Sequence, residues 1–244
     1  RAGTMVMVVV AFAPLAARAQ VLGTWATATP YAGDEMVAGG FFLAGEAWAG
    51  APTEQLRGAV ERVIKTLDDP TLKGPDKVTE RRSAIRKIAN ETFDFVETAK
   101  RSLARHWLAR TEKEREEFTG LFGDLMERSY ISKIDLYGGE KILYTGELLD
   151  GDIATVRTKI MTKGGTEVPV DYRLLRRGDR WLVYDVSVEG VSLINNYRTQ
   201  FNKIIQTSSY QELVKKMKTK QEEFFSEEEI KAKAKAKEAA NTKK

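Results

Sequence analysis

Cysteine is absent from the sequence, and histidine occurs once, as His106, among 244 residues. Without cysteine the chain forms no disulfide, offers no thiolate to a metal and has no cysteine nucleophile. A single histidine is also too few for a multi-histidine metal cluster. We therefore expect neither a metal nor another cofactor, and several classes of enzyme are excluded before any pattern is considered.

A strong excess of charge of either sign is absent as well, because the formal net charge is only +4. An excess this small is weak evidence for nucleic-acid binding, and it suits an anionic membrane surface or an acidic partner equally well. We expect no nucleic-acid partner and only transient contact with membrane surfaces.

The longest apolar run, Met5–Gln20, ends in the small-x-small pattern Ala17–Ala19 that is typical of a signal-peptide cleavage site. The run is too short to span a bilayer comfortably. A second cleavage pattern, Ala47–Ala49, follows, and an uncleaved anchor is the alternative. We interpret residues 1–50 as a signal peptide with a leader or linker, which predicts export.

A helical period in the apolar residues begins at Pro52. Four helices are predicted: one from Pro52 to the "DDP" at 68–70, one that carries Val78 to Ile88, one over Phe93–Arg110 and one that ends near Tyr130. Thr111 and Glu114 have the spacing of a capping box at the start of the last of these helices.

The period then changes to two, which is typical of half-buried strands. The strands are predicted at 142–149, 154–160, 168–174 and 181–188, with glycine-containing turns between them. This pattern indicates an antiparallel meander with one apolar and one wet face. On the last strand, alternation places Leu182, Tyr184, Val186 and Val188 on one face, opposite to Trp181, Val183, Asp185 and Ser187.

Two more helices are predicted after Gly190, a residue that tolerates a positive φ. The first helix is expected to start at Val191–Ile194, and Ser209 with Glu212 forms a capping box for the second. The tail at 226–244 is charged and has no apolar face, so we expect it to be disordered. Residues 51–225 therefore form one α+β domain, a four-stranded curved antiparallel sheet covered by about six helices.

No set of catalytic residues stands out in this domain. His106 has no carboxylate at helical spacing, which favours a position on the helix surface. Asp185 is either a general base or, more commonly for a strand aspartate, a structural anchor. The sequence therefore favours a binding module. The alternatives are an enzyme that acts on an apolar substrate through Asp185, or a protein-binding adaptor whose core is full.

Two stretches resemble the MlaC family, also called toluene-tolerance or ABC-transporter auxiliary proteins. They are "FDFVETAKRSLARHWLARTEKEREEFTGLFGDLMERSYISKI" and "WLVYDVSVEGVSLINNYRTQF", and the resemblance covers about 52–225. It implies a periplasmic phospholipid-binding shuttle between the outer and inner membranes, not an enzyme, and we expect a monomer. Its implied partners are phospholipid, an outer-membrane lipoprotein complex and an inner-membrane ABC transporter with an MCE-domain ring.

A phospholipid carrier must enclose its lipid tails almost completely. With about 15 methylenes per chain at roughly 0.8 kcal/mol each, one exposed tail costs on the order of 12 kcal/mol. We therefore expect an apolar cavity between sheet and helices. Its predicted walls are Leu103, Trp107, Phe118, Leu121, Phe122, Leu125, Val156, Ile160, Val168, Val170, Tyr172, Leu174, Tyr184, Val186, Val188, Val191 and Ile194.

Overall fold

The computed structural model describes residues 51–130 and 137–220. The leader expected at 1–50 and the tail expected at 226–244 lie outside these described residues. The helices are α1 (Ala51–Asp68), α2 (Val78–Thr92), α3 (Phe95–Leu103), α4 (Arg105–Leu108), α5 (Glu112–Tyr130) and α6 (Leu193–Thr207), with short 3-10 helices at Pro70–Leu72 and Pro75–Lys77. The strands are β1 (Lys141–Asp150), β2 (Ile153–Met161), β3 (Glu167–Arg177), β4 (Arg180–Val188) and β5 (Val191–Ser192). A further helical stretch covers 210–220.

The strands form one antiparallel sheet in the order β1-β2-β3-β4-β5, so the predicted meander is confirmed. The two-residue strand β5 is an addition to the four strands that the sequence predicts. Register places Val156, Tyr172 and Val186 side by side across β2, β3 and β4, and all three are buried. The apolar face of the sheet is therefore continuous from strand to strand.

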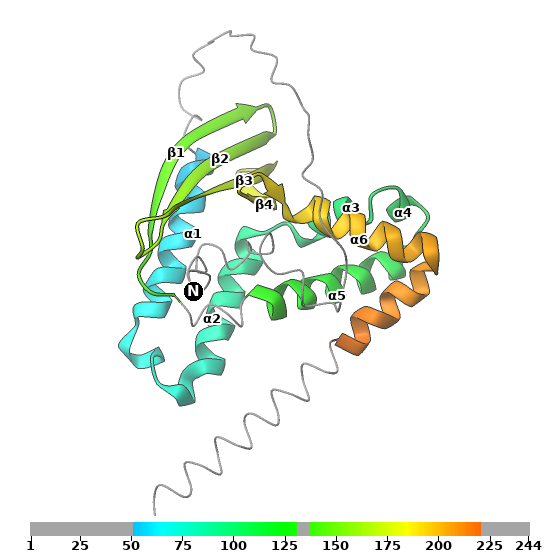
Figure 1. Ribbon diagram of the computed structural model, residues 1–244, viewed down its shortest axis with the longest axis horizontal. Helices are drawn as coiled ribbons and strands as arrows, with labels where there is room; N and C mark the ends of the chain where they lie inside the picture. Colours follow the sequence, from blue (N-terminus) through cyan, green and yellow to red (C-terminus); the bar gives the residue numbers. More distant parts are fainter. Residues whose placement is uncertain (1–50, 131–136, 221–244) are drawn as a thin grey trace, which may run out of the picture.

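The helices lie together on one side of this curved sheet, as expected for the α+β class (Figure 1). α1 packs against β1 and β2 as well as against α2, and α3 packs against α5, α6 and β4. Two capping boxes that the sequence predicts are present at helix starts: the Glu114 amide donates to Thr111 Oγ1 at 3.2 Å and the Glu212 amide to Ser209 Oγ at 3.0 Å.

The single helix predicted over Phe93–Arg110 is broken at Ala104, where φ is 48° and ψ is −123°. Alanine has the highest helix propensity, so nothing in the local sequence signals this break. The break turns α4 so that Trp107 is buried, while Arg105 and His106 both reach Asn202 Oδ1 of α6 at 2.9 Å. Tertiary contacts thus override the local preference for a continuous helix.

A β-bulge in β4 makes the predicted alternation wrong in the first half of this strand. Arg173 pairs with Asp185, but the next residue, Leu174, pairs with Val183, so Tyr184 is the extra residue. A bulge shifts the side-chain phase by one position. Trp181 and Val183 consequently join Val186 in the apolar core, against the sequence prediction that separates them.

Tyr184 is buried outside that core, beneath the guanidinium of Arg101, whose Cζ lies 4.1 Å from the ring centroid. Its carbonyl accepts a hydrogen bond from Thr98 Oγ1 at 3.1 Å. The same side of the sheet is fastened to α3 by the ion pair between Arg177 Nε and Asp94 Oδ2, at 2.8 Å. Tyr184 therefore fixes α3 to the sheet from outside that core, and its predicted contact with a lipid stays a prediction.

An aromatic cluster fills the space between α5 and α6. The ring of Phe118 meets that of Phe201 edge-on at 5.6 Å, and the ring of Phe122 meets that of Tyr197 edge-on at 5.0 Å. Tyr210 also approaches Phe118, with ring centroids 6.4 Å apart. These rings pack against one another at the separations that aromatic pairs favour. This end of the domain is therefore filled by its own side chains.

Candidate functional site

Most of the residues predicted to line the cavity belong to one buried apolar cluster, which we call the core cluster. Its members from that prediction are Leu103, Trp107, Phe118, Leu121, Phe122, Leu125, Val156, Ile160, Val170, Tyr172, Leu174, Val186 and Ile194. Val168 and Val188 are half-buried and pack against it. The structure thus brings these side chains together, and their contact with a lipid stays a prediction.

Val191 does not belong to this group, because it is 40% exposed. The chain turns at Glu189 and Gly190 and pairs Val191 with Val188 as part of β5, so the helix begins two residues later, at Leu193. In the extended segment that precedes it, Ser192 takes the buried position and Val191 the outer one. The prediction that Val191 starts the helix is therefore wrong, and its predicted contact with a lipid stays a prediction.

Half-buried apolar side chains on α1 and β1 were missed by the sequence prediction of the site. Val60 and Ile64 of α1 and Ile142 and Tyr144 of β1 are partly exposed and pack against the core cluster. We call these four residues the α1–β1 seam. The apolar residues of α1 did not indicate a binding site, because an apolar stripe on a helix normally indicates packing against the core. The alternation of Ile142 and Tyr144 in β1 was the signal that could have found the seam.

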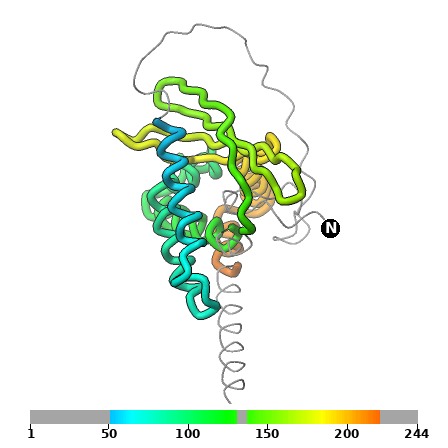
Figure 2. The backbone as a smooth tube through the Cα atoms, turned by 90° about the vertical axis from the view of Figure 1, so that its left-hand side faces the viewer, coloured from blue at the N-terminus to red at the C-terminus, as the bar shows by residue number. Residues whose placement is uncertain are grey.

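Two successive contacts near the start of α1 show that α1 and β1 run antiparallel along this seam (Figures 1 and 2). In the first turn of α1, Thr53 donates from its amide and its hydroxyl to Glu147 Oε2, at 2.9 and 2.5 Å. One turn later, the Arg57 guanidinium lies over the ring of Tyr144, with Cζ 4.6 Å from the centroid. Residues three and four apart share one helix face, which places Val60 and Ile64 next along β1.

The hydroxyl of Tyr144 is buried and has no hydrogen-bond partner among the residues that the structure describes. Burial raises the pKa of Tyr144 to about 12, so the hydroxyl stays protonated at neutral pH. The Nε atom of Arg57 is likewise buried and finds no acceptor within the same described ranges. The seam therefore holds two polar groups with unused hydrogen-bonding capacity beside apolar side chains.

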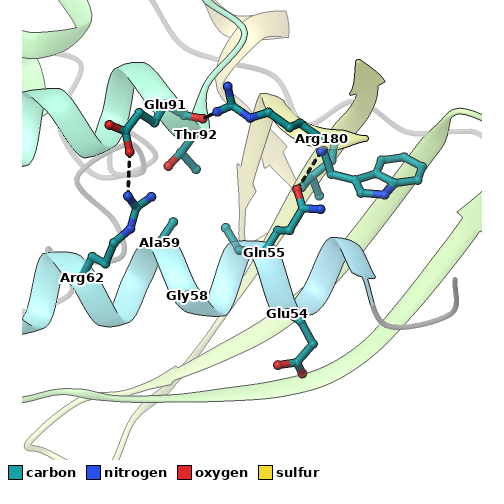
Figure 3. Close-up of a pocket in the computed structure, with 11 residues that line it drawn as sticks. Glu54, Gln55, Gly58, Ala59, Arg62, Glu91, Thr92 and Arg180 are labelled. Atoms are coloured by element: carbon teal, nitrogen blue, oxygen red, sulfur yellow. Dashed lines mark hydrogen bonds and ion pairs between the residues drawn. The ribbon is translucent and has the colours of Figure 1, made fainter. Parts of the chain in front are cut away.

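A separate pocket of about 310 Å³ opens on another face of α1, against the end of α2 and the start of β4 (Figure 3). Its lining mixes polar side chains, including Gln55, Arg62, Glu91 and Arg180, with apolar ones such as Trp181. Arg62 Nη1 pairs with Glu91 Oε2 at 2.6 Å, and Gln55 Oε1 accepts from the amide of Trp181 at 2.8 Å. Its volume is at the lower limit for ligand pockets, and its polarity makes it unsuitable for acyl chains.

Asp185 is buried and accepts two hydrogen bonds at the start of α6. Ser192 Oγ donates to Oδ2 at 2.7 Å, and the Ile194 amide donates to Oδ1 at 3.1 Å. Burial raises the pKa of Asp185 and outweighs these hydrogen bonds, which lower it. Both carboxylate oxygens are thus engaged in joining β4 to α6, in agreement with the anchoring role.

Within 51–130 and 137–220, no group of three or more histidine or acidic side chains is arranged to hold a metal ion. The same part of the chain contains no helix with the length and apolar character needed to cross a bilayer.

A curved antiparallel sheet with one apolar face, covered by helices, defines an α+β domain whose apolar core is bordered along α1 and β1 by half-buried apolar side chains. The family model described as "MlaC protein" matches residues 57–219. The chain therefore belongs to the MlaC family, as the resemblance in the sequence indicated.

Two individual relatives are similar to parts of this chain. The intermembrane phospholipid transport system binding protein MlaC of Haemophilus influenzae is 25% identical over 138 residues, which is 53% of this chain and 64% of that relative. The chain thus matches less than two thirds of that relative's length. A phospholipid-binding protein of Ralstonia solanacearum, solved in complex with a phospholipid, has a TM-score of 0.59 and 23% identity, and the match covers 68% of this chain and 94% of that one. This second likeness shows the shared fold.

Proposed function

We propose that the protein binds a phospholipid and carries it through the periplasm between the outer and inner membranes. The observation that supports this most directly is the α1–β1 seam, where apolar side chains remain partly exposed although they adjoin the core cluster. Half-buried apolar side chains also occur elsewhere at the edge of the core, but in the seam they belong to two elements that run side by side. A lipid carrier needs such a place, because its tails must enter and leave between protein elements.

The tails are proposed to lie between the apolar face of the sheet and α1, not between α5 and α6. The rings of Phe118 and Phe122 are already covered by aromatic partners from α6. The sheet residues that face the proposed site are Val156, Ile160, Val168, Val170, Tyr172, Val186 and Val188. Leu121 and Leu125 of α5, and Leu103 and Trp107 before them, belong to the adjoining part of the core cluster.

The proposed partners follow from family membership and from the names of the relatives. A phospholipid is the cargo. An outer-membrane lipoprotein complex and an inner-membrane ABC transporter with an MCE-domain ring are the two partners that supply or receive it. A carrier that releases its cargo at both stations must bind it with similar affinity at each, so the direction of transport is set by the partners or by ATP hydrolysis.

Substitution of Ile64 by Trp tests the position of the tails. The full chain is incubated with phospholipid vesicles, separated from them and analysed by native mass spectrometry. We expect wild type to carry phospholipid and Ile64→Trp to carry less by on the order of tenfold, because the indole occupies space that several methylenes would fill. The matched control is Val96→Trp on α3, where the native side chain is 58% exposed.

The control is expected to bind as much lipid as wild type, which would show that an added indole does not by itself reduce loading. A wild-type chain that stays free of lipid under these conditions would rule out the carrier function. A folded Ile64→Trp variant with unchanged loading would instead place the tails elsewhere.

A further inference from the structure

Arg57 and Tyr144 present two hydrogen-bond donors to the same small region of the α1–β1 seam. The guanidinium lies over the phenol ring, and Arg57 Nε and the Tyr144 hydroxyl are both buried without an acceptor in the described part of the chain. Buried donors without acceptors are rare in folded proteins, because they lose their hydrogen bonds to water. The two groups are therefore suited to an acceptor that comes from outside the chain.

The ion pair between Arg57 and Glu54 is too weak to occupy the hydrogen-bond donors of the guanidinium. Its Nη2 lies 3.7 Å from Glu54 Oε1, and the two side chains are 43% and 66% exposed. A long ion pair between exposed groups contributes little. A phosphate oxygen, by contrast, forms short charge-assisted hydrogen bonds with a guanidinium, and a second oxygen of the same group is within reach of a neighbouring hydroxyl.

The position along α1 fits a group that is attached to apolar chains. Val60 and Ile64 follow Arg57 on the same helix face, and Ile142 lies two residues before Tyr144 on β1. On the other side, about one helical turn before Arg57, Thr53 donates its two hydrogen bonds to Glu147. A phosphate bound at Arg57 would thus have a fixed polar contact on one side and an apolar seam on the other.

Two carboxylates flank this phosphate position on α1. Glu54 and Glu61 stand three residues before and four residues after Arg57, and both are close enough to Tyr144 to raise the pKa of its hydroxyl. Glu61 is exposed and forms no ion pair with any residue described here. Arg57 carries one positive charge, and Glu54 and Glu61 carry two negative charges. This arrangement is complementary to a ligand in which an anionic group binds at Arg57 and a cationic group lies beside it.

We propose that Arg57 and Tyr144 bind the phosphodiester of the lipid headgroup, and that Glu54 and Glu61 select headgroups that carry a cationic amine over uncharged ones. The proposal rests on the proposed function and adds the headgroup class to it. A zwitterionic headgroup places its amine against the carboxylates. A glycerol headgroup carries no charge beyond the phosphate that both lipids share, so it leaves both carboxylates without a cation.

Loading from mixed vesicles tests this selection. The full chain is incubated with vesicles of equal amounts of phosphatidylethanolamine, phosphatidylglycerol and diacylglycerol with identical acyl chains, and the bound lipids are measured by mass spectrometry. We expect wild type to enrich phosphatidylethanolamine several-fold over phosphatidylglycerol. In the double variant Glu54→Gln/Glu61→Gln this ratio should fall towards one, because the carboxylates are lost but the phosphate donors remain.

The donors are tested by Arg57→Met and Tyr144→Phe, which keep the size of each side chain. We expect Arg57→Met to lower the preference for phospholipid over diacylglycerol on the order of tenfold, and Tyr144→Phe to lower it less. Arg57→Lys should restore part of the preference, since a charge is kept but the planar donor pair is lost. Arg198→Met, which removes an exposed arginine on α6, is the matched control and should leave all ratios unchanged.

The outcomes separate this proposal from the carrier function. A wild-type chain that binds no lipid overturns both. A wild-type chain that loads lipid but shows the same lipid ratios as Arg57→Met and Glu54→Gln/Glu61→Gln overturns the headgroup proposal alone. Millimolar inorganic phosphate is added in a parallel series: unchanged ratios support a headgroup site, and loss of the phospholipid preference would instead indicate a site for free phosphate.

Discussion

Asp185 shows how one residue in a strand fixes the helix that follows it. Its two oxygens accept hydrogen bonds from the Ser192 hydroxyl and the Ile194 amide, and Ser192 Oγ in turn accepts from the Asn195 amide at 3.1 Å. The first turn of α6 therefore receives two acceptors for amides that have no partner within the helix. The sequence predicted an anchor at Asp185, but the identity of its partners depends on a turn that only the fold defines.

The raised pKa of Asp185 predicts a pH dependence of stability. Between the unfolded and the folded pKa, the folded state retains a proton that the unfolded state releases, so the free energy of unfolding decreases as the pH rises through this window. Asp185→Asn removes this contribution. We expect the difference in unfolding free energy, wild type minus Asp185→Asn, to decrease as the pH rises above the ordinary aspartate pKa of about 4, as measured by urea denaturation.

Ser192→Ala provides the complementary variant. It removes the hydroxyl that stabilises the ionised carboxylate and so raises the pKa of Asp185 further, which should extend the decrease to higher pH and make it larger in total. The missing helix cap should cost about 1 kcal/mol in addition. A difference between wild type and Asp185→Asn that is flat, or that grows with pH, would contradict a raised pKa at this position.

The pairing of α1 with β1 sets the geometry of the candidate site at the scale of whole elements. Glu147 belongs to the edge strand of the sheet, and it accepts two hydrogen bonds from Thr53 in the first turn of α1. A bulge between Tyr144 and Gly146 separates this contact from the one beneath Arg57. The position of the helix over the strand is thus fixed by a polar contact at one end, and the apolar seam extends from there.

Removal of this polar contact should weaken the whole domain. We expect Glu147→Ala to lower the free energy of unfolding by about 1–2 kcal/mol, because it leaves the first turn of α1 without its acceptor. Glu167→Ala on β3 is the matched control. There the carboxylate forms only an exposed pair with Lys159, which contributes roughly 0–1 kcal/mol. Equal losses in the two variants, measured by chemical denaturation, would show that the contact does not hold α1.

The molecule as a whole has two apolar regions that differ in how they are filled. Between α5 and α6 the rings of Phe118, Phe122, Tyr197 and Phe201 pack against each other. Between the sheet and α1 the apolar side chains of the seam remain partly exposed. We interpret the first region as the part that stabilises the fold and the second as the part that receives cargo.

This division predicts opposite results for substitutions in the two regions. Phe122→Ala should lower the free energy of unfolding by about 3–5 kcal/mol, because Phe122 is fully buried among other rings. The amount of phospholipid bound per folded molecule should stay at the wild-type value, in contrast to Ile64→Trp. Calorimetry combined with native mass spectrometry measures both quantities. A proportional loss of lipid in the folded fraction of Phe122→Ala would show that the aromatic region also holds cargo.

The sequence predicted the class of fold well, because periodicity depends on which side of an element is buried. The meander, the capping boxes at Thr111 and Ser209, and the buried faces of β2 and β3 all follow from local patterns. The break at Ala104 and the bulge at Tyr184 carry no such pattern, since both arise from contacts between distant segments. The seam between α1 and β1 was missed for a related reason: the alternation of β1 marks its apolar face, but it does not show that α1 is the element that packs there.

The turn at Glu189 and Gly190 has φ values of 50° and 80°, and it returns the chain within two residues. Two-residue connections of this handedness allow little relative movement of the segments that they join. The end of β4 and the beginning of α6 therefore form one rigid unit, which the hydrogen bonds to the Asp185 carboxylate also hold together. We therefore expect any widening of the molecule that admits or releases a lipid to occur at the opposite margin of the sheet, at β1.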